Sequence, residues 1–130
     1  MQKIPKNIQT RTVYIERIRP FMRTPIVKVL TGHRRVGKSY ILFQLMEDIK
    51  KEEPNANLIY INKEDIAFAD MLTGRDLYDY ISSHLMTDCR NYIFVDEIQE
   101  IQDFRMAIRS LALDEANDIY ITGSNSQMFS

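Results

Sequence analysis

This sequence of 130 residues contains one cysteine, no tryptophan and no long hydrophobic run. The single cysteine, Cys89, cannot form a disulfide within the chain, which is typical of proteins in a reducing cytoplasm. No segment approaches the roughly 18 apolar residues of a membrane span, and the N-terminus lacks the apolar core of a signal peptide. We therefore expect a cytoplasmic protein without a membrane partner.

The sequence also lacks an excess of charge of either sign. Lysine and arginine number 17 and aspartate and glutamate number 18, so the net charge is -1 at pH 7. This balance gives no overall basic excess that would predict binding of nucleic acid, although Arg105 and Arg109 offer a local basic face. Hydrophobic residues make up 45% of the chain, enough for one core, and we predict a single domain over residues 1–130.

The most informative stretch is Gly32-His33-Arg34-Arg35-Val36-Gly37-Lys38-Ser39, which matches the phosphate-binding pattern Gly-x-x-x-x-Gly-Lys-Ser/Thr without a mismatch. In such a loop the glycines let backbone N–H groups face an anion, and the lysine reaches the outer phosphates. The serine hydroxyl binds Mg²⁺, and the helix that follows directs its N-terminus at the phosphates. The sequence therefore predicts a nucleotide site formed by these residues and Tyr40.

The segments around this loop have the required order of strand, loop and helix. Residues 26–30 are a short, mostly apolar run before the loop, which predicts a strand. Residues 38–51 are predicted to be a helix, because their apolar side chains recur at helical spacing. The residues of that stripe are Ile41, Leu42, Leu45, Met46 and Ile49.

Three further strands are predicted, because nearly continuous apolar runs are typical of strands buried on both faces of a parallel sheet. Two helices are predicted between them, with Thr73 and Asp103 as their N-capping residues, and residues 1–25 are expected to hold a short lead-in helix. The three strands are residues 58–61, 91–95 and 118–122. This alternation predicts an α/β fold, with the core over residues 26–130.

Polar residues follow two of these strands, where ligands bind in open α/β sheets. Asp96-Glu97 comes directly after the strand over residues 91–95. In a nucleotide hydrolase the first carboxylate holds Mg²⁺ and the second polarises the attacking water. Ser124 and Asn125 follow the last strand, where short polar side chains contact the γ-phosphate, orient the water or simply cap a turn.

A second short sequence bears on which nucleotide base the site would bind. Asn62-Lys63-Glu64-Asp65 matches the Asn-Lys-x-Asp loop of guanine-specific sites, but it follows the second strand, ahead of the acidic strand. The guanine loop comes late in its fold, so we discount the match and predict ATP with Mg²⁺. Glu64 and Asp65 are then residues of a solvated loop, with a contact to the metal shell as the alternative.

Taken together, these segments resemble one family of proteins: the AAA+-type P-loop ATPases of bacteria and archaea that carry a C-terminal domain of unknown function. The resemblance covers nearly the whole chain. It is carried by residues 14–18, 32–39, 92–99 and 119–126.

The resemblance implies a three-layer P-loop fold with a parallel sheet of order 5-1-4-3-2. The fifth strand and the helical lid of the family are absent from this chain, so we expect an N-terminal fragment whose strand one is an exposed sheet edge, prone to self-association. The partners implied are the nucleotide, the C-terminal domain of the same protein and further copies of it in a homo-oligomer. An arginine that commonly completes the family's site is also missing.

The resemblance also implies roles for individual residues. Lys38 corresponds to the phosphate lysine, Ser39 and Asp96 to the Mg²⁺ residues, and Glu97 to the residue that activates water. The sensor of the γ-phosphate corresponds to Ser124 or Asn125.

Three functions fit these residues. The first is an ATPase module that hydrolyses ATP with Mg²⁺ to drive a conformational change. The second is a nucleotide-dependent binding switch for a protein or nucleic acid, with little hydrolysis. The third is a kinase-like phosphoryl transferase, which is disfavoured because an acidic pair directly after a strand suits water activation better than an acceptor substrate.

Overall fold

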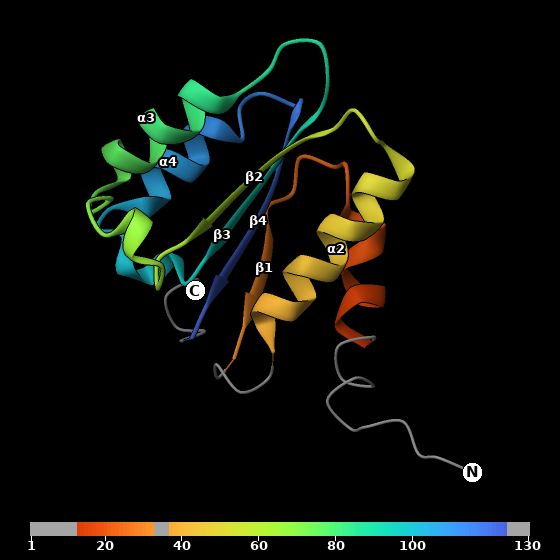
Figure 1. The fold of residues 1–130 in the computed structure, drawn as a ribbon, viewed down its shortest axis with the longest axis horizontal. Coiled ribbons are helices and arrows are strands. Elements are labelled where there is room, and N and C mark those ends of the chain that lie inside the picture. The colour runs from red at the N-terminus through yellow and green to blue at the C-terminus, as the bar shows by residue number, and fades with distance from the viewer. Residues whose placement is uncertain (1–12, 33–36, 125–130) are drawn as a thin grey trace.

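The computed structural model describes residues 13–32 and 37–124, which form a parallel sheet between two layers of helices (Figure 1). The strands are β1 (Lys28–Thr31), β2 (Asn57–Asn62), β3 (Asn91–Asp96) and β4 (Asn117–Gly123). Their order in the sheet is β1-β4-β3-β2, and every neighbouring pair is parallel. This confirms the predicted α/β class and the 1-4-3-2 part of the expected strand order.

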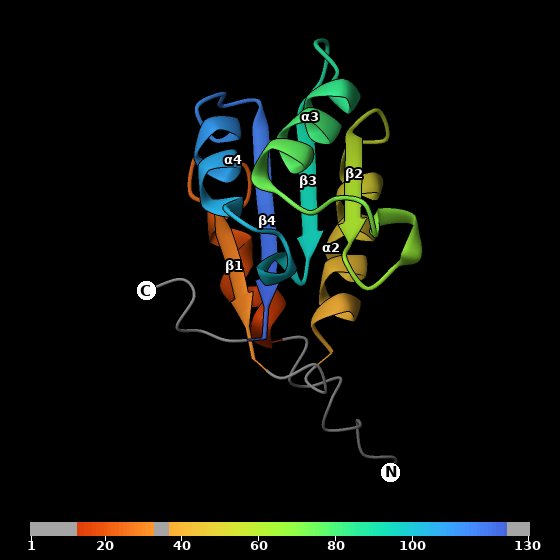
Figure 2. The same ribbon diagram turned by 90° about the vertical axis from the view of Figure 1, so that its left-hand side faces the viewer.

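The helices divide between the two faces of this sheet. Helix α2 (Lys38–Glu52) lies on one face, beside the helical residues 13–18. Figure 2 shows the other face, with α3 (Gly74–His84) and α4 (Phe104–Leu111) in front of the strands. None of the helices within the described ranges has the combination of length and apolar character that crossing a membrane requires.

Short 3₁₀ turns occupy three of the connections between these elements. They are η1 (Arg19–Phe21), η3 (Ile66–Phe68) and η4 (Ile98–Glu100).

The core is divided by the sheet into two apolar clusters. On β3, Tyr92 and Phe94 pack in the cluster beneath α2, whereas Ile93 and Val95 pack in the cluster beneath α3 and α4. This alternation follows from the strand geometry, because successive side chains point to opposite faces. Because helices cover both faces of the sheet, the side chains on both faces of β3 are buried. This explains why most of β3 is a continuous apolar run in the sequence.

The predicted helix starts were confirmed, but one predicted cap was wrong. Thr73 caps α3 in a capping box: its hydroxyl accepts from the N–H of Asp76, whose carboxylate accepts from the N–H of Thr73. Asp103 stands at the N-cap position of α4, yet its side chain makes no capping hydrogen bond. The reason is conformational, because Asp103 is left-handed with φ of 60°, whereas a capping residue is normally extended.

The segment over residues 13–23, which precedes β1, is attached to α2 by packing and by ion pairs. Ile18 and Met22 are buried in the cluster beneath α2, while Phe21 is 47% exposed. Arg19 pairs with Asp48 of α2 at 2.8 Å.

A second arginine, Arg23, forms two ion pairs at the end of this segment. The side chain of Arg23 lies 2.6 Å from Glu52 and 2.8 Å from Glu53, near the C-terminal end of α2. The segment therefore supports the helix that begins at Lys38.

Candidate functional site

Five predicted site residues meet at the carboxyl edge of the sheet; we call them the Lys38 group. Lys38 and Ser39 begin α2, Asp96 ends β3, Glu97 follows it, and Ser124 follows β4. Strands β3 and β4 are parallel neighbours, so their carboxyl ends lie side by side. In Figure 1 the start of α2 and the strand tips lie at the same end of the molecule.

Lys38 lies at the centre of this group and is only 3% exposed. Its Nζ donates to the carbonyl oxygens of Gly32 at 2.6 Å and Gly123 at 2.9 Å, and to Ser124 Oγ at 3.2 Å. The same Nζ lies 3.1 Å from Glu97 Oε1. The lysine thus connects the start of the loop, the end of β4 and the acidic pair through one buried ammonium group.

The loop reaches Lys38 through glycines in conformations that other residues rarely adopt. Gly32 has φ of 132° and Gly37 has φ of 77°, and Gly37 is the N-cap of α2. Both values favour glycine, because a Cβ is strained at positive φ. The backbone can therefore turn sharply into the helix at Lys38.

Asp96 is held by three hydroxyl groups and is 1% exposed. Ser39 and Tyr60 donate to its Oδ2, the latter at 3.0 Å, and Thr122 donates to Oδ1 at 2.6 Å. Burial, followed by the charge of Asp96, raises the pKa of the Tyr60 phenol, so that phenol remains a donor. Hydrogen bonds from hydroxyl groups to a carboxylate are short and strong, and they fix both oxygens of Asp96.

Glu97 adopts the left-handed conformation with φ of 59°, which turns its side chain toward Lys38. Its backbone N–H donates to Thr122 Oγ1 at 2.9 Å. Its carboxylate accepts from Gln99 and from Ser124, whose Oγ lies 3.0 and 2.8 Å from the two oxygens. Burial raises the pKa of Glu97, but the hydrogen bonds and the charge of Lys38 outweigh burial and hold the pKa below its usual value.

The donor set at this edge suits Mg²⁺. Ser39 and Asp96 offer a hydroxyl and a carboxylate within hydrogen-bond distance of each other, and Mg²⁺ prefers such oxygen ligands. Residues 13–32 and 37–124 hold no cluster of three or more His, Cys, Asp or Glu that could bind a metal by itself. Mg²⁺ is commonly bound by one or two carboxylates together with nucleotide phosphates, and the pair here fits that mode.

The remaining predicted residues divide into two sets. Tyr40 is 63% exposed, and its ring lies edge-on to Phe43 with the centroids 6.4 Å apart. The others lie outside the described residues: His33, Arg34, Arg35, Val36 and Asn125.

Three residues of the site were missed by the sequence analysis: Tyr60, Gln99 and Thr122. Tyr60 and Thr122 lie within apolar strands, where a polar side chain directed at the site is hard to tell from one in the core. The polar Thr122 at the end of a buried strand was the available signal. Gln99 contributed to the family resemblance but was assigned no role.

The Asn62–Asp65 loop hydrogen-bonds within itself and to η3. Asn62 Oδ1 accepts from the N–H of Glu64 at 3.0 Å, and Asp65 Oδ1 accepts from the N–H of Ala67 at 2.9 Å. Lys63 Nζ donates to the carbonyl of Phe68 at 2.7 Å. These contacts form a turn that starts η3, in keeping with the interpretation of this string as a loop.

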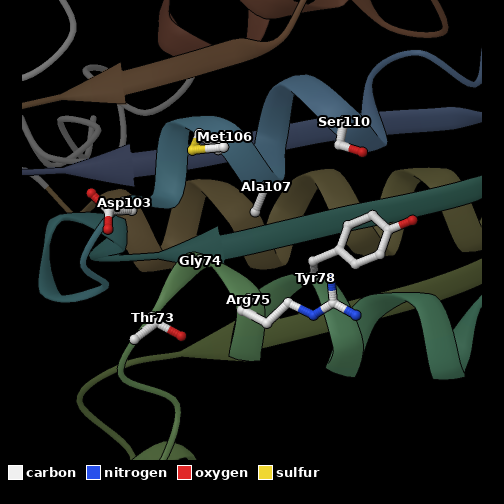
Figure 3. A pocket seen from close by; sticks show the side chains of 8 residues that line it. All are labelled: Thr73, Gly74, Arg75, Tyr78, Asp103, Met106, Ala107 and Ser110. Carbon is white, nitrogen blue, oxygen red and sulfur yellow. The ribbon is translucent and has the colours of Figure 1, made fainter.

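A separate hollow of about 600 Å³ lies between α3 and α4 (Figure 3). The two helices approach closely at their first turns, where a Cβ on Gly74 would lie 2.3 Å from the carbonyl oxygen of Asp103. Figure 3 shows Arg75 and Met106 beside the hollow, one from each helix. The Lys38 group contributes nothing to its lining, so the hollow is distinct from the candidate site.

Comparison with known proteins gives one family and two relatives. The model of the family described as AAA domain matches residues 24–130, which indicates a nucleotide-binding, ATPase-like module. An uncharacterised protein of Haemophilus influenzae is 28% identical over 127 residues, covering 96% of this chain and 32% of that protein. An uncharacterised protein of Methanocaldococcus jannaschii is 34% identical over 104 residues, covering 80% of this chain and 22% of that protein. The chain thus spans a third or less of the length of both relatives.

Proposed function

Because the chain belongs to the AAA domain family, we propose that it is an ATPase module that binds ATP with Mg²⁺ and hydrolyses its terminal phosphoanhydride bond. The observation that carries the proposal is the 3.1 Å contact between Lys38 Nζ and Glu97 Oε1. This contact brings the phosphate loop and the acidic pair into one buried group, as phosphoryl transfer to water requires.

The binding residues follow from their chemistry. The ammonium group of Lys38 would neutralise the outer phosphates, and the N–H groups at the start of α2 would face them. Ser39 and Asp96 would hold Mg²⁺, which neutralises charge on the phosphates when it is bound. Gly32 and Gly37 would let the backbone approach the nucleotide closely.

Glu97 would orient the attacking water and accept its proton. The water oxygen forms a bond to the γ-phosphorus as the bond from that phosphorus to the bridging oxygen breaks, which releases ADP and phosphate. Ser124 contacts both Lys38 and Glu97, so a change at the γ-phosphate would reach β4 through this hydroxyl. The hydrolysis would then drive a conformational change in the rest of the protein or in further copies of it.

A nucleotide-dependent binding switch with little hydrolysis is the second candidate. It is favoured by the saturation of Glu97, whose two carboxylate oxygens already accept hydrogen bonds from Ser124 and Gln99 and contact Lys38. A carboxylate engaged in this way must rearrange before it can accept a proton from water. Such hydrogen bonds often tighten or change only in the substrate complex, so the ATPase remains the first candidate.

Single-turnover phosphate release separates the two candidates. With ATP and excess protein, we expect release above the uncatalysed rate in Mg²⁺, and release at the uncatalysed rate in EDTA. The physical reason is that removal of Mg²⁺ leaves the phosphate charge uncompensated. ATP that binds in the presence of Mg²⁺ but is released without hydrolysis would instead establish the switch.

A further inference from the structure

Thr122 is the one residue whose side chain contacts both acidic residues of the site among those that the structure describes. Its Oγ1 donates to Asp96 Oδ1 at 2.6 Å and accepts from the backbone N–H of Glu97 at 2.9 Å. Thr122 is fully buried, and both contacts are buried. One hydroxyl group therefore joins the carboxylate of Asp96 to the backbone of Glu97.

The position of this hydroxyl follows from the register of the sheet. Val95 of β3 pairs with Ile121 of β4, so the residues that come next, Asp96 and Thr122, lie beside each other where β3 leaves the sheet. At that point the N–H of Glu97 bonds to a side chain of β4. A buried N–H needs such a partner, and Thr122 supplies it.

The same contact stabilises an unusual conformation. Glu97 has φ of 59° and ψ of 52°, a left-handed conformation that residues with a side chain adopt at an energetic cost. This conformation aims the carboxylate at Lys38 and Ser124. Such a conformation persists only where neighbouring groups stabilise it. The hydrogen bond from the backbone N–H of Glu97 to Thr122 is one such contact.

We propose that Thr122 is a positioning residue that sets Asp96 for Mg²⁺ and Glu97 for water through the two hydrogen bonds of its single hydroxyl group. This inference rests on the proposed ATPase function. It assigns to β4 a role that is separate from contact with the nucleotide, because Thr122 acts only through the two acidic residues.

The test compares Thr122→Val, which keeps the shape and removes the hydroxyl, with Thr122→Ser, which keeps the hydroxyl and removes the methyl group. Thr87→Val makes the same change at an exposed loop position. Each protein is assayed for ATP binding with and without Mg²⁺, for single-turnover phosphate release and for thermal unfolding. Tyr60→Phe is added because the Tyr60 hydroxyl donates to Asp96 Oδ2 at 3.0 Å, so this variant tests a contact to the Asp96 carboxylate by itself.

We expect Thr122→Val to weaken the Mg²⁺-dependent part of ATP binding and to lower turnover at saturating Mg²⁺·ATP by about 10- to 100-fold, the size expected for lost hydrogen bonds at charged groups. Thr122→Ser should restore both, and Thr87→Val should match the wild type. Tyr60→Phe should weaken Mg²⁺-dependent binding by a larger factor than it lowers turnover.

Three results would overturn the proposal. Thr122→Val that matches the wild type in both assays would show that the hydroxyl is dispensable. Thr122→Ser that is as impaired as Thr122→Val would assign the effect to packing of the methyl group. If the wild-type protein binds Mg²⁺·ATP without turnover, only the proposed ATPase activity is ruled out, and the binding assay still decides the role of Thr122. If the wild-type protein binds no ATP, both the ATPase function and the role of Thr122 are ruled out.

Discussion

Glu97→Gln is expected to lower ATP turnover about 10²- to 10⁴-fold, the range that general acid–base catalysis contributes. Glutamine has nearly the same shape and keeps an oxygen that can accept from Ser124, but it cannot take a proton from water. ATP binding should remain or become tighter, because Lys38 loses a competing negative partner at 3.1 Å. Phosphate release measures the expected loss of turnover, and ATP binding, measured on the same preparation, checks that affinity is kept or increased.

The matched control for this variant is Glu100→Gln. Glu100 lies three residues further on, in η4, and is exposed. We expect its turnover to equal that of the wild type. Undiminished turnover in Glu97→Gln would remove Glu97 from the mechanism, whereas equal losses in both variants would point to a general effect of charge.

A large loss of stability is expected when a buried carboxylate is removed at the end of the sheet opposite the Lys38 group. Asp118, near the start of β4, is fully buried and forms an ion pair with Lys28 of β1. It also accepts from Tyr120 Oη at 2.6 Å and from the N–H of Arg23 at 2.9 Å. Asp118→Ala should lower the free energy of unfolding by about 3–5 kcal/mol, because it leaves the buried ammonium of Lys28 unpaired.

Urea unfolding at neutral pH measures this loss, and Asp88→Ala, at an exposed loop position, is the control. The double variant Lys28→Met/Asp118→Leu should lose less than Asp118→Ala, since it leaves no buried charge without a partner. A loss below about 1 kcal/mol in Asp118→Ala, the range of surface pairs, would contradict the account. The pair is remote from the Lys38 group, so the folded variant should still bind ATP.

The arrangement of the fold was predictable because its signals are local. An apolar run indicates a strand without knowledge of the strand's neighbours, as at residues 58–61 and 91–95. A capping residue indicates the start of a helix in the same way, as at Thr73. The strand order came from the family resemblance, because parallel pairing depends on contacts far apart in the sequence. The cap of Asp103 was predicted wrongly, since its left-handed backbone cannot be read from the residue type and lies where Gly74 of another helix packs closely against it.

The candidate site was predictable only where residues stand next to a recognisable motif. Lys38 and Ser39 belong to the loop pattern, and Asp96-Glu97 follows an apolar strand. Thr122 and Tyr60 reach Asp96 from β4 and β2, on either side of β3, so their contacts exist only after the strands are placed in order. The pairing of Lys28 with Asp118 was missed for the same reason, because 90 residues separate them in the sequence.

The most direct test of the account is a titration of ATP, with Mg²⁺ and with EDTA, against the wild type, Lys38→Ala and Lys50→Ala. Lys50 is an exposed lysine of the same helix and serves as the matched control. We predict Mg²⁺-strengthened binding to the wild type and to Lys50→Ala, and binding at least about tenfold weaker to Lys38→Ala, because the phosphates lose a charged hydrogen-bond donor. Binding of equal strength to Lys38→Ala and to the wild type would contradict a nucleotide site at the Lys38 group.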